Sequence, residues 1–260
     1  MYFFAILYLM TWARRRKFIY LGTIALIFII LIVWFLFAHF YKPPNCFDGL
    51  KNQDEVGVDC GGTCTLLCAD QYVPLNILWS RFSKVSDGVY NVLAYIENPN
   101  SNARADNLDY VFKLYDKDGT LLSRRSGKTF AGANKTLVVF EAEMQTGNKI
   151  PDRVDFSFTS EAVWSKQISA ENGLAVSESV ISKEETAPRL SASVFNKTAN
   201  KITNIEAVAI VYDLSANATA FSRTIIDYIE GKNSQTIYFN WPKAFASKYS
   251  RTEIILKVLK

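Results

Sequence analysis

The residues best suited to chemistry lie in one stretch, CFDGLKNQDEVGVDCGGTC, which runs from Cys46 to Cys64. All cysteines of the chain fall in or just after this stretch. An even number of closely spaced cysteines in an oxidising compartment predicts disulfides, here two bridges with three possible pairings. The alternative is a zinc site of four thiolates, which usually has two close pairs of ligands rather than a lone first cysteine. We expect two disulfides, with the pairing left open, among Cys46, Cys60, Cys64 and Cys68.

Oxygen-bearing side chains lie between the first two cysteines, and such hard ligands suit Ca²⁺. An EF-hand loop counted from Asp48 would need a ligand at its third position and glycine at its sixth, where Leu50 and Gln53 stand. The alternative is that the oxygens cap backbone amides in turns. The sequence therefore leaves calcium as a candidate cofactor beside the turn interpretation. The candidate ligands are Asp48, Asn52, Glu55 and Asp59.

The rest of the sequence offers little for catalysis. The only histidine, His39, lies inside a long apolar run, so a Ser-His-Asp or Cys-His group elsewhere has no histidine to use. G-x-S-x-G, H-E-x-x-H and phosphate-loop motifs are absent from the sequence. A hydrolase built on carboxylates alone stays formally possible. We expect no enzyme and no small-molecule substrate.

One apolar run predicts a membrane helix. FIYLGTIALIFIILIVWFLFAHFY, from Phe18 to Tyr41, carries no charged side chain. As a helix it would be roughly 36 Å long, more than the roughly 30 Å of a hydrocarbon core. A basic cluster precedes it, and positive charge favours the cytoplasmic side. The cluster consists of Arg14, Arg15, Arg16 and Lys17. We expect an uncleaved signal anchor in the cell membrane, with a cytoplasmic N-terminus and extracytoplasmic domains after Tyr41.

The alternative is a cleaved signal peptide, which has a shorter apolar stretch followed by a small-x-small site. FLFAHFYKPP, at the end of the apolar run, has no such site. The first twelve residues, MYFFAILYLMTW, are apolar but too short to span a membrane. They predict a cytoplasmic or interfacial N-terminus and leave open whether translation starts at Met1 or Met10.

The distribution of charge limits the partners. The chain has 29 Lys and Arg against 25 Asp and Glu, a formal net charge of +4. Four of the basic residues form the cluster at positions 14 to 17, and the first acidic residue is Asp48, so the rest of the chain is balanced. A nucleic-acid-binding face needs a basic excess that this balance does not supply. The expected partners are the membrane and an envelope protein or surface polymer.

After Cys68 the sequence changes to short runs rich in Val, Ile, Tyr and Phe, separated by turn residues, which is typical of strands. This part also aligns with itself at a period of about 98 residues, and a unit of that size is a domain. VLAYIENPNSNARADNLDYVFKLYD matches LSASVFNKTANKITNIEAVAIVYD, and AGANKTLVVF matches EGKNSQTIYF. The aligned pairs are Asn98 and Asn196, Tyr115 and Tyr212, Asp116 and Asp213, Gly132 and Gly231, and Phe140 and Phe239.

The spacing of these runs predicts a mainly β protein with two tandem antiparallel, immunoglobulin-like β-sandwiches. In the first copy we expect strands near 75–84, 89–97, 107–115, 120–126, 135–143 and 153–159. YDKDGT joins two of them as a hairpin, and turn chemistry accounts for Asp116 and Asp118. The junction from Ser160 to Asn172 is short, so we expect the sandwiches to dock as a semi-rigid rod.

The predicted domains follow from these boundaries. Residues 1–17 form the N-terminus, 18–41 the transmembrane helix, 42–70 the disulfide module, 71–162 the first sandwich and 163–260 the second.

Two short motifs carry resemblances. Phe112 to Asp116 spell FKLYD, which resembles the FxLYD domain, an immunoglobulin-like module of prokaryotic envelope proteins; the second copy keeps only Tyr212 and Asp213 of it. The first cysteine stretch resembles short modules of the form C-x-D-G-x-x-N-x-x-E-x-G-V-D-C-G-G-x-C in bacterial surface proteins. These resemblances imply sandwiches outside the membrane of a bacterial envelope and an extracytoplasmic spacer, with no defined catalytic role.

Two functions of different class fit this organisation. In the first, the anchor and stapled stalk hold paired sandwiches above the membrane for a structural or binding role. In the second, the protein is an accessory or sensor subunit coupled to a membrane complex through its helix. That coupling would need a face of small or polar residues, to which YLGTIA, from Tyr20 to Ala25, corresponds weakly. We favour the first.

Overall fold

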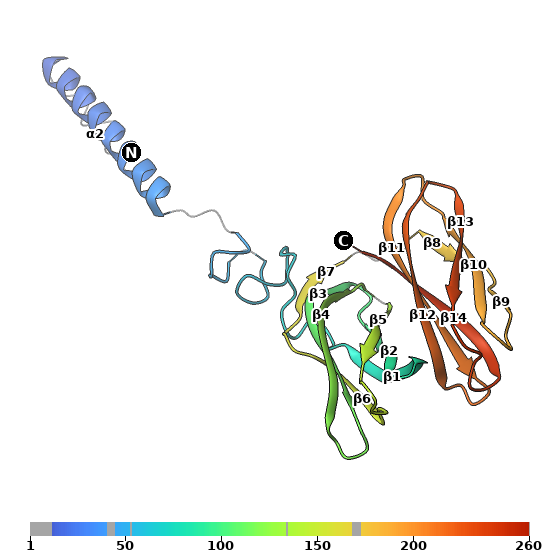
Figure 1. Cartoon of the computed structure of the whole chain (residues 1–260). Coiled ribbons are helices and arrows are strands. Elements are labelled where there is room, and N and C mark those ends of the chain that lie inside the picture. The colour runs from blue at the N-terminus through green and yellow to red at the C-terminus, as the bar shows by residue number, and fades with distance from the viewer. Residues whose placement is uncertain (1–11, 41–44, 53, 134, 168–172, 260) are drawn as a thin grey trace.

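The computed structural model describes residues 12–40, 45–52, 54–133, 135–167 and 173–259. It contains one long helix, a loop-rich stalk and two β-sandwiches (Figure 1). The expected choice between Met1 and Met10 and the expected helix end at Tyr41 lie outside these residues.

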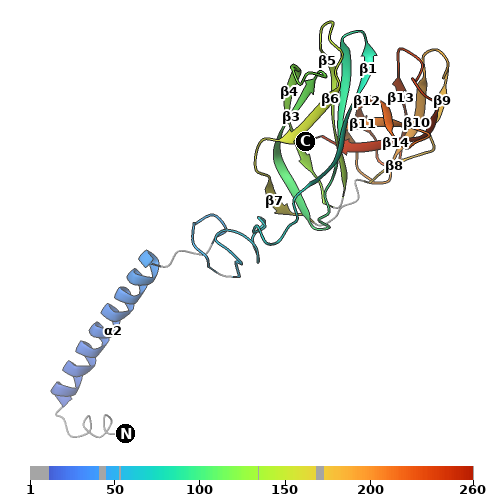
Figure 2. The same ribbon diagram turned by 90° about the horizontal axis from the view of Figure 1, so that it is seen from below.

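Helix α2 spans Trp12–Phe40, and its part from Arg14 to Phe40 is long and apolar enough to cross a membrane. Its large apolar side chains are exposed, as a lipid-facing surface requires. The helix projects away from the stalk and the sandwiches (Figure 2). The helix begins before the predicted apolar run, so the basic cluster lies on its first turns. The guanidinium of Arg16 lies over the ring of Trp12, 3.9 Å from the centroid.

Sandwich 1 consists of two antiparallel sheets, one with the order β1-β2-β5 and one with the order β4-β3-β6. Strand β7 pairs with β3 beside β6, so β6 and β7 occupy consecutive stretches of the same edge. Alternate residues of β2, namely Val92, Ala94 and Ile96, point into the core together with Phe112 and Leu114 of β3. The strands are β1 Asn76–Ser86, β2 Val89–Glu97, β3 Ala103–Tyr115, β4 Leu121–Ala131, β5 Thr136–Gln145, β6 Arg153–Phe158 and β7 Val163–Lys166.

Sandwich 2 repeats this arrangement. Strand β10 pairs with β13 on one edge and with β8 and β9 on the other, and the second sheet has the order β12-β11-β14. Its core contains Leu190, Val194, Ile226 and Phe239. The strands are β8 Leu174–Val176, β9 Val180–Ser182, β10 Arg189–Asn196, β11 Ile202–Asp213, β12 Ala218–Ile229, β13 Ser234–Asn240 and β14 Tyr249–Val258.

All six strands predicted in the first copy are present. The largest differences concern β3, which begins at Ala103, and β4, which continues to Ala131. The two strands form one long hairpin whose pairing extends to Ala105 and Ala131, beyond the runs that the hydrophobic pattern marked. Cross-strand hydrogen bonds therefore lengthen strands past their apolar segments.

Aligned asparagines have the same structural role in both sandwiches. Asn98 is buried and donates from Nδ2 to the carbonyls of Ala103 and Gly132, each at 2.8 Å. Asn196 is buried and donates to the carbonyls of Asn200 and Ile229, at 2.8 and 3.0 Å. Each amide thus joins the segment after its own strand to the end of the hairpin that follows, through hydrogen bonds to backbone carbonyls.

The aligned aspartates also match. Asp116 Oδ1 accepts from the amide of Thr120 at 2.7 Å, and Asp213 Oδ1 accepts from the amide of Asn217 at 2.9 Å. Each closes the hairpin after its long strand, as turn chemistry predicted for Asp116. The left-handed position of the turn is taken by Gly119 in sandwich 1, with φ of 77°, and by Ala216 in sandwich 2, with φ of 59°.

One predicted alignment between the two copies, that of Phe140 with Phe239, is wrong by one residue. Phe140 pairs with Leu93 and points away from the core of sandwich 1, whereas Phe239 pairs with Leu190 and points into the core of sandwich 2. The ladder places Tyr238 at the position that matches Phe140, because Tyr238 pairs with Ser191. A shift of one residue exchanges the two faces of a strand, so the sequence alignment put Phe239 on the wrong face.

The sandwiches dock against each other, and they pack side by side through sheet faces (Figure 1). The face of β1-β2-β5 meets the face of β12-β11-β14, and strands β1 and β12 make the most extensive contact. Docking was expected, but its geometry depends on which sheet faces are apolar.

Candidate functional site

The stalk, residues 45–70, is held by two disulfides. Cys46 is bonded to Cys64 and Cys60 to Cys68, and no described cysteine is free. This is the predicted disulfide set, and it resolves the pairing that the sequence left open. All four sulfurs are consumed in bridges, so a zinc site of four thiolates does not form in this oxidised protein. A segment of this size cannot bury a core of its own, and covalent bridges replace one.

The candidate calcium ligands accept hydrogen bonds from their own loop. Asp59 accepts from the amides of Asp48 and Gly49, each at 3.0 Å, and Asp48 Oδ2 accepts from Asn52 Nδ2 at 2.9 Å. Glu55 Oε2 accepts from the amides of Asn52 and Asp59, at 3.2 and 3.3 Å. These are the bonds of the turn interpretation.

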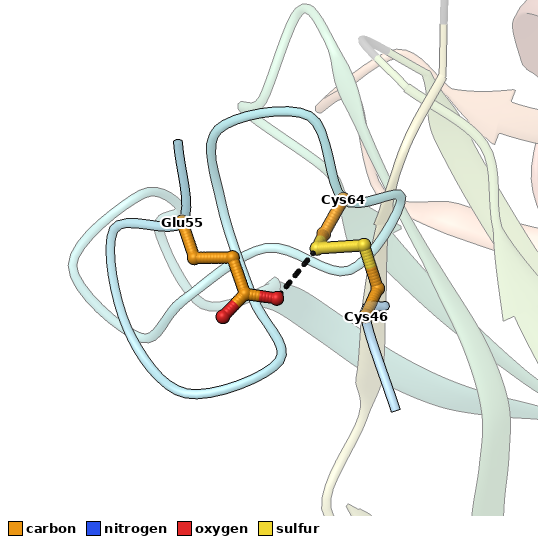
Figure 3. Close-up of side chains that lie close together, drawn as sticks. All are labelled: Cys46, Glu55 and Cys64. Carbon is orange, nitrogen blue, oxygen red and sulfur yellow. Dashed lines mark hydrogen bonds between the residues drawn. A yellow bond between two sulfur atoms is a disulfide. The ribbon is translucent and has the colours of Figure 1, made fainter. Parts of the chain in front are cut away.

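The same residues fit an ion only in part. Glu55 is 7% exposed, and its Oε1 lies 3.2 Å from Cys64 Sγ (Figure 3). That sulfur carries no proton because it is in a disulfide, so the contact is not a hydrogen bond. Asn52 Oδ1 is buried without a donor among the described residues. Calcium stays a prediction, and an ion would compete with backbone amides for most of the carboxylate oxygens.

The stalk is joined to sandwich 1 by backbone hydrogen bonds. The amide of Leu67 donates to the carbonyl of Trp164 at 3.0 Å, and the amide of Lys166 donates to Thr65 at 2.8 Å. The ring of Tyr72 stacks on that of Trp164, with 4.5 Å between centroids. The stalk therefore continues the sheet beyond β7, which fixes its orientation against sandwich 1.

Between the sandwiches lies a shared apolar cluster, which we call the seam. Sandwich 1 contributes the outward side chains of its β1-β2-β5 sheet, and sandwich 2 contributes those of its β12-β11-β14 sheet. The buried members are as shielded from water as those of the two cores, so the pair behaves as one folded unit. The seam consists of Leu93, Val138, Phe140, Val208, Ile210, Tyr212, Ala218 and Phe221, with Trp79, Tyr95, Ala142 and Ile255 at its margin.

A single carboxylate links the sandwiches within the seam. Glu253 Oε1 accepts from the hydroxyl of Tyr95 in sandwich 1 at 2.9 Å, and Oε2 accepts from the hydroxyl of Tyr212 in sandwich 2 at 2.8 Å. Burial, reinforced by this carboxylate, raises the pKa of both phenols above the usual value. Both tyrosines therefore stay neutral and donate at ordinary pH.

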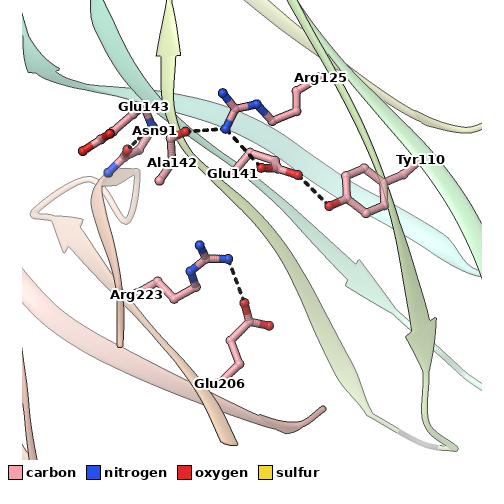
Figure 4. Close-up of polar contacts among 8 residues, drawn as sticks. All are labelled: Asn91, Tyr110, Arg125, Glu141, Ala142, Glu143, Glu206 and Arg223. Carbon is pink, nitrogen blue, oxygen red and sulfur yellow. Dashed lines mark hydrogen bonds and ion pairs between the residues drawn. The ribbon is translucent and has the colours of Figure 1, made fainter. Parts of the chain in front are cut away.

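Further polar contacts border the seam, among them the pair of Arg223 and Glu206 (Figure 4). Arg81 Nη2 donates to Asn217 Oδ1 at 3.0 Å, from one sandwich to the other. The guanidinium of Arg223 lies 5.3 Å from the ring of Phe140, across the seam, and pairs with Glu206 of its own sandwich at 3.3 Å. These contacts fix the register in which the two faces meet.

On the sandwich 1 side, Tyr110 donates to Glu141 Oε1 at 2.8 Å. Burial, followed by this hydrogen bond, raises the pKa of the Tyr110 phenol. Gly127, opposite Tyr110 on β4, makes room for the ring, since a Cβ there would lie 2.3 Å from the Tyr110 hydroxyl. Arg125 also reaches Glu141, at 3.4 Å, and donates to the carbonyl of Ala142 at 2.7 Å.

The sequence predicted the cysteines and the basic cluster as sites but missed the seam. A signal was present, since β2 reads VYNVLAYIE, with Leu93 and Tyr95 apolar at positions that should face water. Such a two-sided apolar strand is typical of a sheet buried on both faces.

No family model matches the chain, and no curated protein is found to match it. Among solved structures, a transglutaminase of red sea bream is similar over 72% of this chain and 29% of its own, at 10% identity and a TM-score of 0.25. A beta-glucuronidase of Bacteroides uniformis is similar over 66% of this chain and 25% of its own, at 12% identity and a TM-score of 0.25. A second beta-glucuronidase of that organism covers 67% and 25%, at 14% identity and a TM-score of 0.25.

The chain spans less than a third of these similar structures, and likenesses at this score carry no conclusion on activity. The class that the structure itself defines is a mainly β protein with one potential membrane helix, a disulfide-bonded stalk and two packed sandwiches.

Proposed function

We propose that the protein is a non-catalytic, single-pass membrane protein that presents two packed β-sandwiches outside the cytoplasm for a binding or structural role in a bacterial envelope. The observation that carries this proposal is the continuity of the stalk with sandwich 1. Backbone hydrogen bonds at Leu67 and Lys166 hold the disulfide module to the sheet, and the potential membrane helix ends at Phe40, shortly before Cys46. The arrangement suits a spacer of fixed orientation.

The orientation in this proposal rests on charge and chemistry. Arg14, Arg15, Arg16 and Lys17 precede the apolar part of α2, and positive charge favours the cytoplasmic side. Two disulfides follow the helix, which suits an oxidising compartment. We include the FxLYD assignment in the proposal, because both sandwiches have the same strand order and the aspartate of the motif closes the same hairpin in each.

The alternative role, an accessory or sensor subunit coupled through the helix, needs polar groups on α2 that face a partner. The hydroxyl of Thr23 donates to the carbonyl of Tyr20 in the same helix, at 2.9 Å. This internal bond satisfies the hydroxyl, so we favour an anchor.

The test is a reporter fused after Lys260 in intact cells, combined with alkylation of the cysteines in non-reduced protein. We expect an extracytoplasmic reporter and no alkylated cysteine. A cytoplasmic signal would overturn the proposal. Crosslinking in the native envelope, followed by identification of the captured molecule, would then name the partner.

A further inference from the structure

A cavity of about 80 Å³ lies beside the seam, with walls from both sandwiches. Sandwich 1 contributes Arg104, Phe130, Lys135 and Gln167, and sandwich 2 contributes Lys257 from β14. The cavity therefore forms only when the sandwiches are packed together. Its size exceeds what one water needs and suits a small oxyanion.

Lys257 provides an ammonium group without an anionic partner. Its Nζ donates to Thr129 Oγ1 at 2.5 Å and lies 4.6 Å from the centroid of Phe130. It forms no ion pair within the part of the chain that the structure describes. Burial lowers its pKa, and the opposing effect of Glu206 is weaker. An ammonium withdrawn from water is stabilised by a counter-charge.

Arg104 provides a buried donor that lacks an acceptor among the described residues. Its Nη2 pairs with Asp106 at 2.6 Å, but its Nε is buried without an acceptor among the described residues. The guanidinium lies 5.7 Å from the centroid of Phe130, the ring that Lys257 also approaches. Since nearly all buried N–H groups in proteins are paired, the unpaired Nε of Arg104 indicates an acceptor that binds in the cavity. The ammonium of Lys257 on the same wall favours an acceptor with negative charge.

Two carboxylates act on this region, and neither lies in the cavity wall. Asp106 is paired with Arg104 Nη2, and Glu206 is paired with Arg223. The described residues of the cavity wall include three cationic side chains, Arg104, Lys135 and Lys257, and no carboxylate. Asp106 compensates the charge of Arg104, whereas Lys257 has no ion-pair partner among the described residues.

We propose that this cavity binds an oxyanion, a phosphate, sulfate or carboxylate group, between Arg104 Nε and Lys257 Nζ, with Lys135 alongside. Because both sandwiches line the cavity, the bound anion stabilises their packing. The site deepens the proposed function by giving the binding surface a ligand class, an anionic surface polymer, and this biological role rests on that function.

The experiment measures thermal unfolding of the full chain in nanodiscs of zwitterionic lipid. Sodium phosphate, sulfate or acetate is titrated against sodium chloride at matched ionic strength. We expect a saturable rise in the melting temperature with at least one oxyanion and none with chloride. The oxyanion with the largest effect identifies the group that the cavity fits.

Two variants assign the effect to the cavity. Lys257→Met should lose the rise, whereas Lys232→Met, at an exposed lysine outside the cavity, should keep it. Gln167→Glu places a carboxylate in the wall and retains the acceptor for the amide of Ala133, which Gln167 Oε1 now binds at 3.0 Å. It should raise the melting temperature without added anion and abolish the response. Gln235→Glu, on exposed β13, should do neither.

Equal rises in the wild type and in both Lys257→Met and Gln167→Glu would show a general salt effect and overturn the site. A response to the oxyanion without binding of a soluble polyuronate or polyphosphate would overturn the polymer ligand and leave the anion site. A cytoplasmic reporter after Lys260 would overturn the proposed function, while the anion response of the purified protein would be unaffected.

Discussion

The two sandwiches have the same strand order but bury opposite faces. Sandwich 1 covers the outward face of its β1-β2-β5 sheet, which carries Leu93 and Tyr95. The matching positions of sandwich 2 hold Ser191 and Ser193, and that face is turned to solvent. On the other sheet it is sandwich 2 that buries the outward face, since it has the buried Ile210 where sandwich 1 has Lys113.

This difference shows that strand order and docking are encoded at different positions of the same strands. The inward residues define a sandwich and are apolar in both copies. The outward residues define which face can pack against a neighbour, and they differ between the copies. Because successive side chains of a strand point to opposite faces, the outward residues can change while the inward residues stay the same.

The largest expected effect on stability comes from replacing the seam residue Ile210 of sandwich 2 by lysine, the residue at the matching position of sandwich 1. Ile210→Lys buries an unpaired ammonium, which should cost about 3–5 kcal/mol of unfolding free energy or separate the sandwiches. Urea unfolding and small-angle scattering of the full chain in nanodiscs would measure both. The mirror change, Lys113→Ile, should alter stability by less than about 0.5 kcal/mol. Similar effects of the two changes would contradict the asymmetry.

The second largest effect should come from removing a disulfide of the stalk, and it should affect sandwich 1 more than sandwich 2. It is bonded to sandwich 1, so Cys46→Ser with Cys64→Ser should destabilise the stalk by about 3 kcal/mol and loosen β7. Hydrogen exchange would show faster exchange of the amides of Leu67 and Lys166. The amides of β10 in sandwich 2 should keep their protection. Equal loss in both sandwiches would mean that the stalk acts on the whole head.

Replacing either buried asparagine should destabilise the protein to a similar extent, because the two have the same structural role in their sandwiches. Asn98→Ala and Asn196→Ala each remove two hydrogen bonds to backbone carbonyls, and each should cost about 1–3 kcal/mol. Denaturant unfolding would measure both. Asn102→Ala, at an exposed asparagine, is the control and should be near neutral. A large effect at only one of the buried asparagines would show that the two turns are not equivalent.

The smallest expected effect concerns alkaline pH. Tyr95 and Tyr212 have raised pKa values in the folded protein, so their contribution is present below about pH 10 and is lost as pH rises beyond it. Tyr212→Phe should cost about 1 kcal/mol at neutral pH and make stability less sensitive to alkali. The aligned Tyr115→Phe lies outside the seam and should leave the pH profile unchanged. A profile that Tyr212→Phe does not alter would contradict the role of Glu253.

Much of the fold could be predicted because it depends on local patterns. Alternation and turn residues predicted the six strands of the first copy, and the aspartate of FKLYD predicted its hairpin. The cysteine spacing predicted disulfides, but their pairing depends on which sulfurs the loop brings together. The alignment of Phe140 with Phe239 as equivalent positions was wrong, because sequence similarity does not fix the hydrogen-bond register of a strand.

The sequence by itself determined the class of each segment, namely an apolar helix behind a basic cluster, a cysteine-bridged stalk and two β-domains, because composition and periodicity act within a few residues. Only the tertiary structure decided that Glu253 joins Tyr95 to Tyr212 and that Arg104 and Lys257 share a cavity. Those groups are distant in the chain and meet only where two apolar faces exclude water. The free energy of that burial, rather than any local propensity, places them together.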